Sequence, residues 1–129
     1  MIVGQQFSEN FQITNEVHIA FMQAFKDFNA LHTNNDYAKS KGFKAKVMHG
    51  NILCGFLSCF VGEMLPFKNT VIHSIEIVFR KPSYLYENLE LQATVIEIYE
   101  SVNTYLFKFK FKCENETRAS GKIQIGILV

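Results

Sequence analysis

The sequence lacks the features that mark several common classes of protein. It has three cysteines, an odd number with no Cys-x-x-Cys pair, which indicates free thiols in a reducing compartment rather than a disulfide framework. Its 13 Lys and Arg nearly balance its 12 Asp and Glu, giving a net charge of +1. No run of five like charges occurs, so the concentrated basic surface of a nucleic-acid-binding protein is missing.

Long apolar runs are missing as well. The longest, residues 52–61, is interrupted by Gly55 and Ser58 and falls far short of the roughly 20 residues that span a bilayer. The first ten residues, MIVGQQFSEN, have neither the basic start nor the long apolar centre of a secretory signal. We therefore predict a cytoplasmic protein with no membrane segment.

Apolar residues are plentiful, and their spacing predicts helices in the first half of the chain. The length of 129 residues and a hydrophobic share of 48% suit a single domain over residues 1–129. Thr14 stands where an N-cap is expected, ahead of apolar residues at helical spacing, which predicts a helix over residues 15–26. Asn and Asp then predict a loop over residues 27–34, followed by a short helix over residues 36–40.

The next helix, predicted over residues 50–65, differs in kind. Apolar side chains leave it no polar face, and Glu63 is its only charge. A helix that is hydrophobic on every side is expected to be buried on every side. Pro66 ends it, because the residue before a proline is disfavoured in helical conformation.

From Thr70 onward the apolar residues alternate with period two, which predicts four long strands. The phase slips near residues 95 and 96, which indicates a β-bulge. His73 falls on the apolar phase and is expected to be a core histidine, whereas His18 is expected to be exposed. With a weaker strand over residues 5–11, the order of strand, helices, buried helix and four strands predicts an α+β fold.

The residues that suggest chemistry lie between Asp27 and the strands. They read DFNALH over residues 27–32, Gly-Phe at 42–43 and His-Gly-Asn at 49–51, with Phe79, Pro82 and the Tyr86-Glu87 pair further on. These positions resemble the motif of the MaoC-like, (R)-specific enoyl-CoA hydratase family over nearly the whole chain, with Tyr86-Glu87 in the place of the family's Gly-Asp pair. The resemblance implies a hot-dog fold, an antiparallel sheet wrapped around a long buried central helix.

The resemblance also implies a reaction and a site for it. Members add water to a trans-2-enoyl thioester, or remove it from an (R)-3-hydroxyacyl thioester, on coenzyme A or acyl carrier protein. Asp27 and His32 would hold the attacking water and share its protons. The backbone N–H of Gly50, at the start of the central helix, would bind the carbonyl oxygen of the thioester. Asn51, His49 and Asn29 complete the expected oxyanion and substrate-binding set.

The expected partners follow from the same resemblance. We expect an acyl-CoA or acyl-carrier-protein substrate, no cofactor and no nucleic acid. We also expect a homodimer, with the acyl tunnel at the interface between subunits. The spacing of the four histidines and three cysteines shows no paired metal ligands of the zinc kind, so no metal is expected.

Departures from the family motif keep two alternatives open. Ala30 replaces the proline of the loop, Gly55 replaces a serine thought to orient the histidine, and Asn51 replaces a bulky apolar residue. Outside the family context, Asp27 and Asn29 would be read as turn residues. A hot-dog thioesterase is disfavoured because the only carboxylate on the central helix is Glu63, near its far end. A non-catalytic acyl-binding or interaction module is the second alternative.

Overall fold

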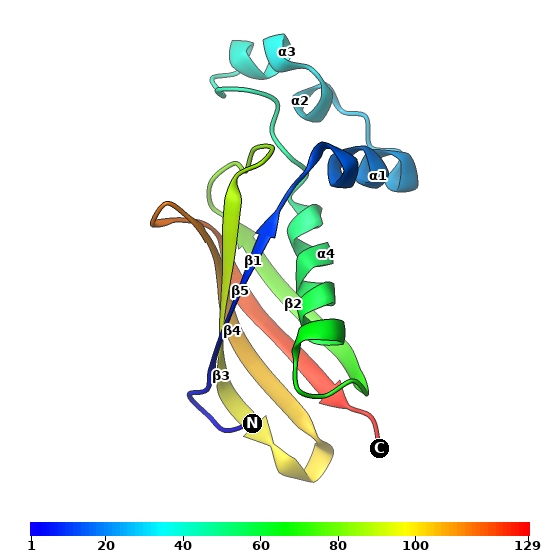
Figure 1. Ribbon diagram of the computed structural model, residues 1–129, viewed down its shortest axis with the longest axis vertical. Coiled ribbons are helices and arrows are strands. Elements are labelled where there is room, and N and C mark those ends of the chain that lie inside the picture. The colour runs from blue at the N-terminus through cyan, green and yellow to red at the C-terminus, as the bar shows by residue number, and fades with distance from the viewer.

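The computed structural model describes residues 1–129 and contains one five-stranded antiparallel sheet with the spatial order β1-β3-β4-β5-β2. Its strands are β1 (Gln6–Gln12), β2 (Thr70–Phe79), β3 (Asn88–Tyr99), β4 (Thr104–Cys113) and β5 (Glu116–Ile127). The strands β3, β4 and β5 follow one another as a meander, while β1 and β2 form the two edges (Figure 1). The predicted α+β class and all five predicted strands are confirmed.

The helices lie between β1 and β2 in the sequence. They are α1 (Asn15–Phe25), α2 (Ala30–Thr33), α3 (Asn35–Ser40) and α4 (Asn51–Cys59), and α4 continues as the π-helical turn η1 (Phe60–Met64). A 3-10 turn, η2 (Glu100–Val102), joins β3 to β4. None of the helices combines the length and the apolarity that crossing a membrane requires.

Local sequence signals explain where the helices begin and end. The Thr14 hydroxyl accepts a hydrogen bond from the Val17 N–H at 3.2 Å, as predicted for the N-cap of α1. The predicted loop over residues 27–34 contains the unpredicted turn α2, because the Asn29 side chain caps it by accepting from the Leu31 N–H at 2.9 Å. Asn34 caps α3 in the same way.

The core lies between α4 and the inner face of the sheet. In β4, Phe107, Phe109 and Phe111 are buried, whereas the alternating Lys108 and Lys110 are exposed on the outer face. A shift of register between Val95 and Glu97 confirms the predicted bulge in β3. The inward-facing aromatic residues of β4 therefore supply much of the surface on which α4 packs.

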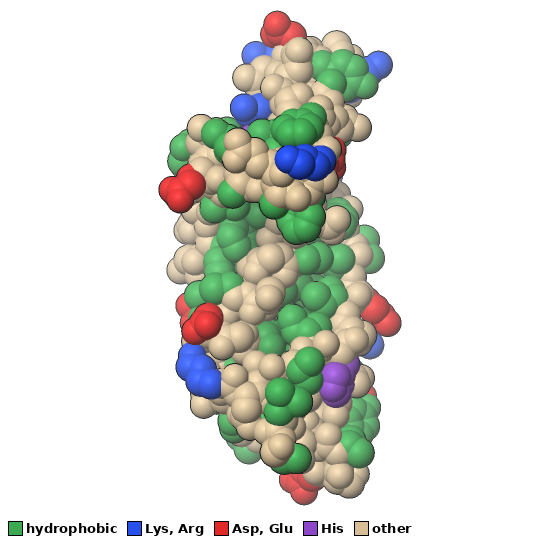
Figure 2. All heavy atoms as spheres, turned by 90° about the vertical axis from the view of Figure 1, so that its right-hand side faces the viewer, with side chains coloured by type: hydrophobic (Ala, Val, Ile, Leu, Met, Phe, Trp, Pro, Cys, Tyr) green, Lys and Arg blue, Asp and Glu red, His purple; other side chains and the backbone are tan.

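The prediction that the central helix is buried on every side is wrong. Ile52, Leu53 and Leu57 are buried against the sheet, but the opposite side of the helix is exposed. The exposed side is formed by small and polar residues, namely Asn51, Gly55, Ser58 and Cys59. Figure 2 shows apolar side chains gathered over this same face of the molecule. One side of the chain's most apolar helix is thus left uncovered by the sheet.

Strand β2 also departs from the predicted alternation. Its register with β5 shifts between Ile72 and Ser74, so that His73 is the extra residue of a bulge. As a result Val71 is exposed, and His73 is exposed rather than buried in the core as predicted. A bulge reverses the side-chain phase on one side of it, and the apolar pattern of residues 71–79 did not reveal it.

Candidate active site

The segment from Asp27 to Gly50 brings three ionisable side chains together beside the N-terminal end of α4. These are Asp27, in the turn after α1, His32 on α2, and His49, which directly precedes Gly50. One ligand atom from each lies within 4.8 Å of the others. The two residues predicted from the sequence to handle protons, Asp27 and His32, are therefore close enough to act on one small molecule.

Asp27 presents its carboxylate at the surface. Its side chain is 47% exposed, and its Oδ1 accepts a hydrogen bond from the Asn29 N–H at 3.2 Å. Asn29 thus contacts both Asp27 and α2, and it ties this loop together through backbone groups. The Asp27 carboxylate remains open to solvent on one side.

His32 is half-buried, and its orientation is fixed by one hydrogen bond. Its Nδ1 lies 2.7 Å from the carbonyl oxygen of Val47. Because a carbonyl only accepts, Nδ1 carries the hydrogen, and Nε2 of the neutral ring is left with a free lone pair. This is the tautomer that a general base requires.

His49 is buried behind this pair, with 3% of its surface exposed. Its Nε2 donates to the backbone carbonyl of Asp27 at 3.1 Å and lies 3.8 Å from that residue's carboxylate. Its ring packs against the rings of His32 and Phe21, with centroid separations of 3.9 and 4.7 Å. Burial lowers the pKa of His49 below its ordinary value, so the ring is kept neutral and holds the Asp27 turn in place.

The same three residues have the donor types of a metal site, although the spacing of ligands in the sequence predicted none. The Nε2 atom of His49 that faces Asp27 carries its hydrogen toward a backbone carbonyl, so that nitrogen has no lone pair free for a metal ion. We therefore retain the prediction of a metal-free site.

Gly50 contributes an unpaired backbone donor. Its N–H makes no hydrogen bond within the chain, as expected at the start of a helix, and the helix dipole favours negative charge there. A Cβ on Gly50 would lie 2.8 Å from the Phe79 ring. The absence of a side chain therefore allows Phe79 to lie directly against the helix start.

Two cavities meet at this cluster. One of about 440 Å³, with polar and apolar groups in its lining, reaches Asp27, His32, His49, Gly50 and Asn51 and is also lined by residues 79–83. A mostly apolar one of about 850 Å³ lies between α1 and α4. Both are lined by Phe21, Asp27 and Asn51. The exposed Asn51, which replaces a bulky apolar residue of the family motif, therefore stands where the cavity that holds the ionisable cluster meets the apolar trough.

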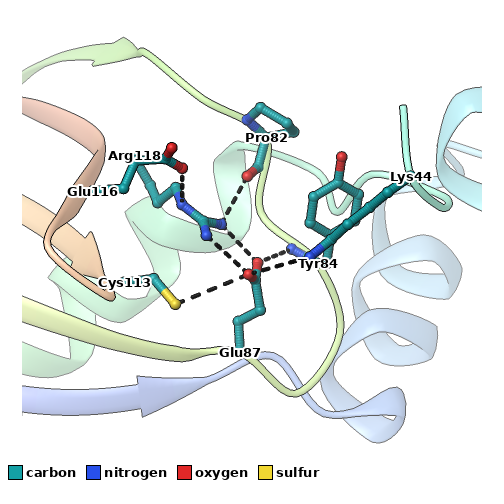
Figure 3. Close-up of polar contacts among 7 residues, drawn as sticks. All are labelled: Lys44, Pro82, Tyr84, Glu87, Cys113, Glu116 and Arg118. Atoms are coloured by element: carbon teal, nitrogen blue, oxygen red, sulfur yellow. Dashed lines mark hydrogen bonds and ion pairs between the residues drawn. The ribbon is translucent and has the colours of Figure 1, made fainter. Parts of the chain in front are cut away.

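A buried ion pair fixes the loop that lines this smaller cavity (Figure 3). Arg118 of β5 donates to both carboxylate oxygens of Glu87, at 2.7 and 2.9 Å, and to the Pro82 carbonyl at 2.8 Å. The Tyr84 N–H also donates to Glu87 at 2.7 Å. Burial opposes ionisation of Glu87, but these bonds outweigh it, so the pKa of its carboxyl group lies below the ordinary value.

The loop in turn contacts the segment that carries the histidines. The Met48 N–H donates to the Ser83 carbonyl at 2.9 Å, one residue before His49. Tyr86, which stands where the family motif has glycine, adopts the left-handed conformation with φ 63°. Its hydroxyl accepts from the Asn15 N–H at 3.2 Å in the first turn of α1, so the side chain gains a contact that glycine cannot make.

Sequence reasoning missed one residue near the site. His18, which was expected to be exposed, is 1% exposed, and its ring lies 5.5 Å from that of His49 between centroids. Its place four residues after the N-cap of α1 gave no sign of this, because the neighbours that bury it come from residues 32–49. His18 and these neighbours are brought together only by tertiary packing, which the spacing of residues in the sequence does not reveal.

Comparisons with known proteins agree with the motif. No protein-family model matches the chain. It is 26% identical over 111 residues, 86% of its length, to a mitochondrial 3-hydroxyacyl-[acyl-carrier-protein] dehydratase of Arabidopsis thaliana. It is 30% identical over 69 residues, 54% of its length, to an (R)-specific enoyl-CoA hydratase of Rhodospirillum rubrum. The matched regions cover 66% and 48% of those relatives, so the chain spans about half to two thirds of their length.

The fold itself is shown by solved structures. An (R)-hydratase from Aeromonas caviae involved in PHA biosynthesis superposes with a TM-score of 0.91 at 19% sequence identity, covering 99% of this chain and 98% of that one. The hot-dog architecture expected from the motif is thereby confirmed. The resemblance to MaoC-like (R)-hydratases is likewise confirmed by the names of the relatives.

Proposed function

We propose that this chain, a hot-dog relative of the MaoC-like (R)-specific enoyl-CoA hydratases, adds water to a trans-2-enoyl thioester or removes it from the (R)-3-hydroxyacyl thioester. The observation that carries the proposal is the convergence of Asp27 and His32 beside the free N–H of Gly50. The thioester would be carried by coenzyme A or by acyl carrier protein, as the names of the two relatives suggest.

The water molecule would lie between Asp27 and His32. A separation of at most 4.8 Å between their polar atoms fits one molecule hydrogen-bonded to both groups, since each such bond is about 2.8 Å long. One group takes the proton as the water oxygen attacks C3, and C2 then receives a proton to complete the addition. The hydrogen bond from His32 to the Val47 carbonyl leaves Nε2 as the nitrogen available for this transfer.

The thioester carbonyl would lie at the start of α4. Negative charge develops on its oxygen during the reaction, and the Gly50 N–H together with the helix dipole would stabilise that charge. The acyl chain would then extend past Asn51 into the apolar trough between α1 and α4. This arrangement requires no cofactor or metal.

The experiment is a crotonyl-CoA hydration assay that follows both the enoyl absorbance and the release of free thiol. Asp27→Asn and His32→Ala should each lower kcat by about 10²–10⁴-fold, the usual contribution of an acid–base group. The double variant should be little worse than the poorer single one, because the two residues act on one water. Near-full hydration by Asp27→Asn would contradict the assignment, and thiol release without hydration would indicate a thioesterase.

A specific feature weakens the thioesterase alternative. Glu63, the only carboxylate on the central helix, has a side chain that is 78% exposed at the end away from the cavities and pairs with Lys68. A non-catalytic acyl-binding module would bind crotonyl-CoA and leave both the enoyl absorbance and the thioester unchanged. The same assay therefore separates the three functions.

We also propose that the protein acts as a homodimer. Strand β2 is an unpaired edge, and Val71, Val78 and Phe79 on it are 39%, 54% and 49% exposed. An exposed edge strand with exposed apolar side chains, next to a helix side that the sheet does not cover, favours association with a second copy. The acyl tunnel would then lie at the interface. Sedimentation at micromolar concentration should give a dimer, and a monomer would count against this arrangement.

The remaining expectations belong to the same proposal. We take residues 1–129 to act as one domain and to work in the cytoplasm. Localisation of the tagged protein by fluorescence tests the second of these. It is a pointed test, because the Arabidopsis relative is named as mitochondrial.

A further inference from the structure

The most unusual buried group near the site is the His18 side chain. It is 1% exposed, and neither of its ring nitrogens has a hydrogen-bond partner. Leaving a buried polar group unpaired destabilises the folded protein, and buried polar atoms in native proteins are nearly always paired. An apolar residue would fill the same space in α1 without this cost.

A second unpaired atom lies next to it. His49 uses Nε2 to hold the Asp27 carbonyl, while its Nδ1 is buried and has no partner. In the neutral ring, Nδ1 is then an acceptor that lacks a donor. His18 carries one N–H in either neutral tautomer, so it has the group that Nδ1 lacks.

The two rings are close enough to satisfy each other. Their centroids lie 5.5 Å apart with an interplanar angle of 41°, a separation at which ring nitrogens turned toward each other would be within hydrogen-bonding distance. Burial, with a contribution from Lys46, lowers the pKa of His18, and burial lowers that of His49. Both rings are therefore neutral near pH 7, as a hydrogen bond between imidazoles requires.

We propose that His18 is a positioning residue that donates a hydrogen bond to His49 Nδ1 and thereby fixes His49 as the Nε2–H tautomer. The proposal rests on the proposed function of the site. His49 in that tautomer donates to the Asp27 carbonyl and holds the turn that presents the Asp27 carboxylate. Its ring also supports the ring of His32 at 3.9 Å. His18 thus acts through His49 on both groups that would handle protons, without contacting substrate.

A competing acceptor lies nearby. The backbone carbonyl of His32 is close enough to favour the charged form of His18, but it is outside hydrogen-bonding geometry of either ring nitrogen. A bond to that carbonyl would anchor α2 and leave the tautomer of His49 unaffected. The tautomer of His49 therefore distinguishes the two arrangements.

The test compares two substitutions of His18 in the full-length protein. His18→Gln keeps a side-chain donor of similar reach, whereas His18→Leu fills the space without one. We expect His18→Leu to lower kcat for crotonyl-CoA about 10-fold with little change in KM, and His18→Gln to restore most of the loss. The nitrogen-15 shifts of the His49 ring, measured by NMR, should report Nε2–H in the natural protein and in His18→Gln and a tautomer mixture in His18→Leu.

The NMR readout keeps this inference separate from the proposed function. If the natural protein does not hydrate crotonyl-CoA, the proposed function fails while the tautomer measurement still tests the role of His18. If His18→Leu leaves both kcat and the His49 shifts unchanged, His18 is only a core residue and the inference is wrong. His49 shifts that respond equally to both substitutions would overturn it as well, since loss of packing would then explain the change.

Discussion

Breaking the ion pair between Arg118 and Glu87 should destabilise the protein by an amount that the structure allows us to estimate. Their side chains are 9% and 15% exposed, so solvent screens the pair little. Removing one partner of a buried, hydrogen-bonded pair costs about 3–5 kcal/mol, because the other charge stays buried without compensation. After Glu87→Gln, Arg118 keeps the Pro82 carbonyl and the Glu116 carboxylate, 2.7 Å from its Nε, so we expect the lower end, about 3 kcal/mol.

The assay is urea unfolding followed by circular dichroism, at one fixed protein concentration because association would add to the apparent stability. A matched control is the exposed pair of Glu63 and Lys68, at 78% and 66% side-chain exposure. Glu63→Gln should change the free energy of unfolding by less than about 0.5 kcal/mol. The contrast between the two substitutions isolates the effect of burial.

A double-mutant cycle tests the pairing itself. Replacing both Glu87 and Arg118 by Met removes both charges. The loss of unfolding free energy in the double variant should therefore be smaller, by about 2 kcal/mol or more, than the sum of the losses in the two single Met variants. Additive losses, or a loss below about 1 kcal/mol for Glu87→Gln, would refute the reasoning. In that case the 80–87 loop would be held by backbone bonds such as that from Met48 to Ser83.

Three further predictions concern the site and the sheet. The pKa values of His18 and His49 in the folded protein lie below the 6.5 of a free histidine, so at acidic pH the unfolded chain binds more protons than the folded one. As the pH is lowered past about 6.5, the free energy of unfolding should therefore decrease, by up to 1.4 kcal/mol per pH unit for each residue. Urea midpoints at pH 7 and 5 check this, and His18→Leu should reduce the slope. Gly50→Val should push the Phe79 ring into the cavity and lower kcat/KM about 10²-fold, with an unchanged dichroism spectrum. The third prediction concerns the lysines of β4, namely Lys108, Lys110 and Lys112. If this face is only solvated, replacing all three with Gln should leave KM for an acyl-CoA unchanged. A raised KM would instead indicate that they form a docking surface.

Much of the fold follows from patterns that act locally. Alternation in β4, the N-cap at Thr14 and the helix-ending Pro66 each depend on neighbouring residues, and the elements they predict are present. The bulge at His73 was missed because it depends on the register with β5. The exposed side of α4 was missed because a hydrophobic pattern predicts that a helix is buried but does not show whether the same chain provides a neighbour for each of its sides.

The candidate site could be predicted only within one segment of the chain. The motif singled out Asp27, Asn29, His32, His49 and Gly50, and the structure brings Asp27, His32 and His49 of this segment together. His18 lies outside it and reaches the site only through tertiary packing. The left-handed conformation of Tyr86 could not be predicted either, because it occurs at a residue other than glycine.

Residues 27–50 lie between the two edge strands, β1 and β2, in the sequence, and this position has a consequence for how the protein folds. β3, β4 and β5 are joined by short turns and can pair as they leave the ribosome, whereas β1 must wait for β3 and β2 must wait for β5. Closing those long loops is entropically costlier than forming the adjacent hairpins. The residues of the candidate site are therefore synthesised early but oriented late, and we expect the two edges to open more easily than the meander once the protein has folded. A hot-dog domain built in this order forms its central strands first and orders its candidate site last.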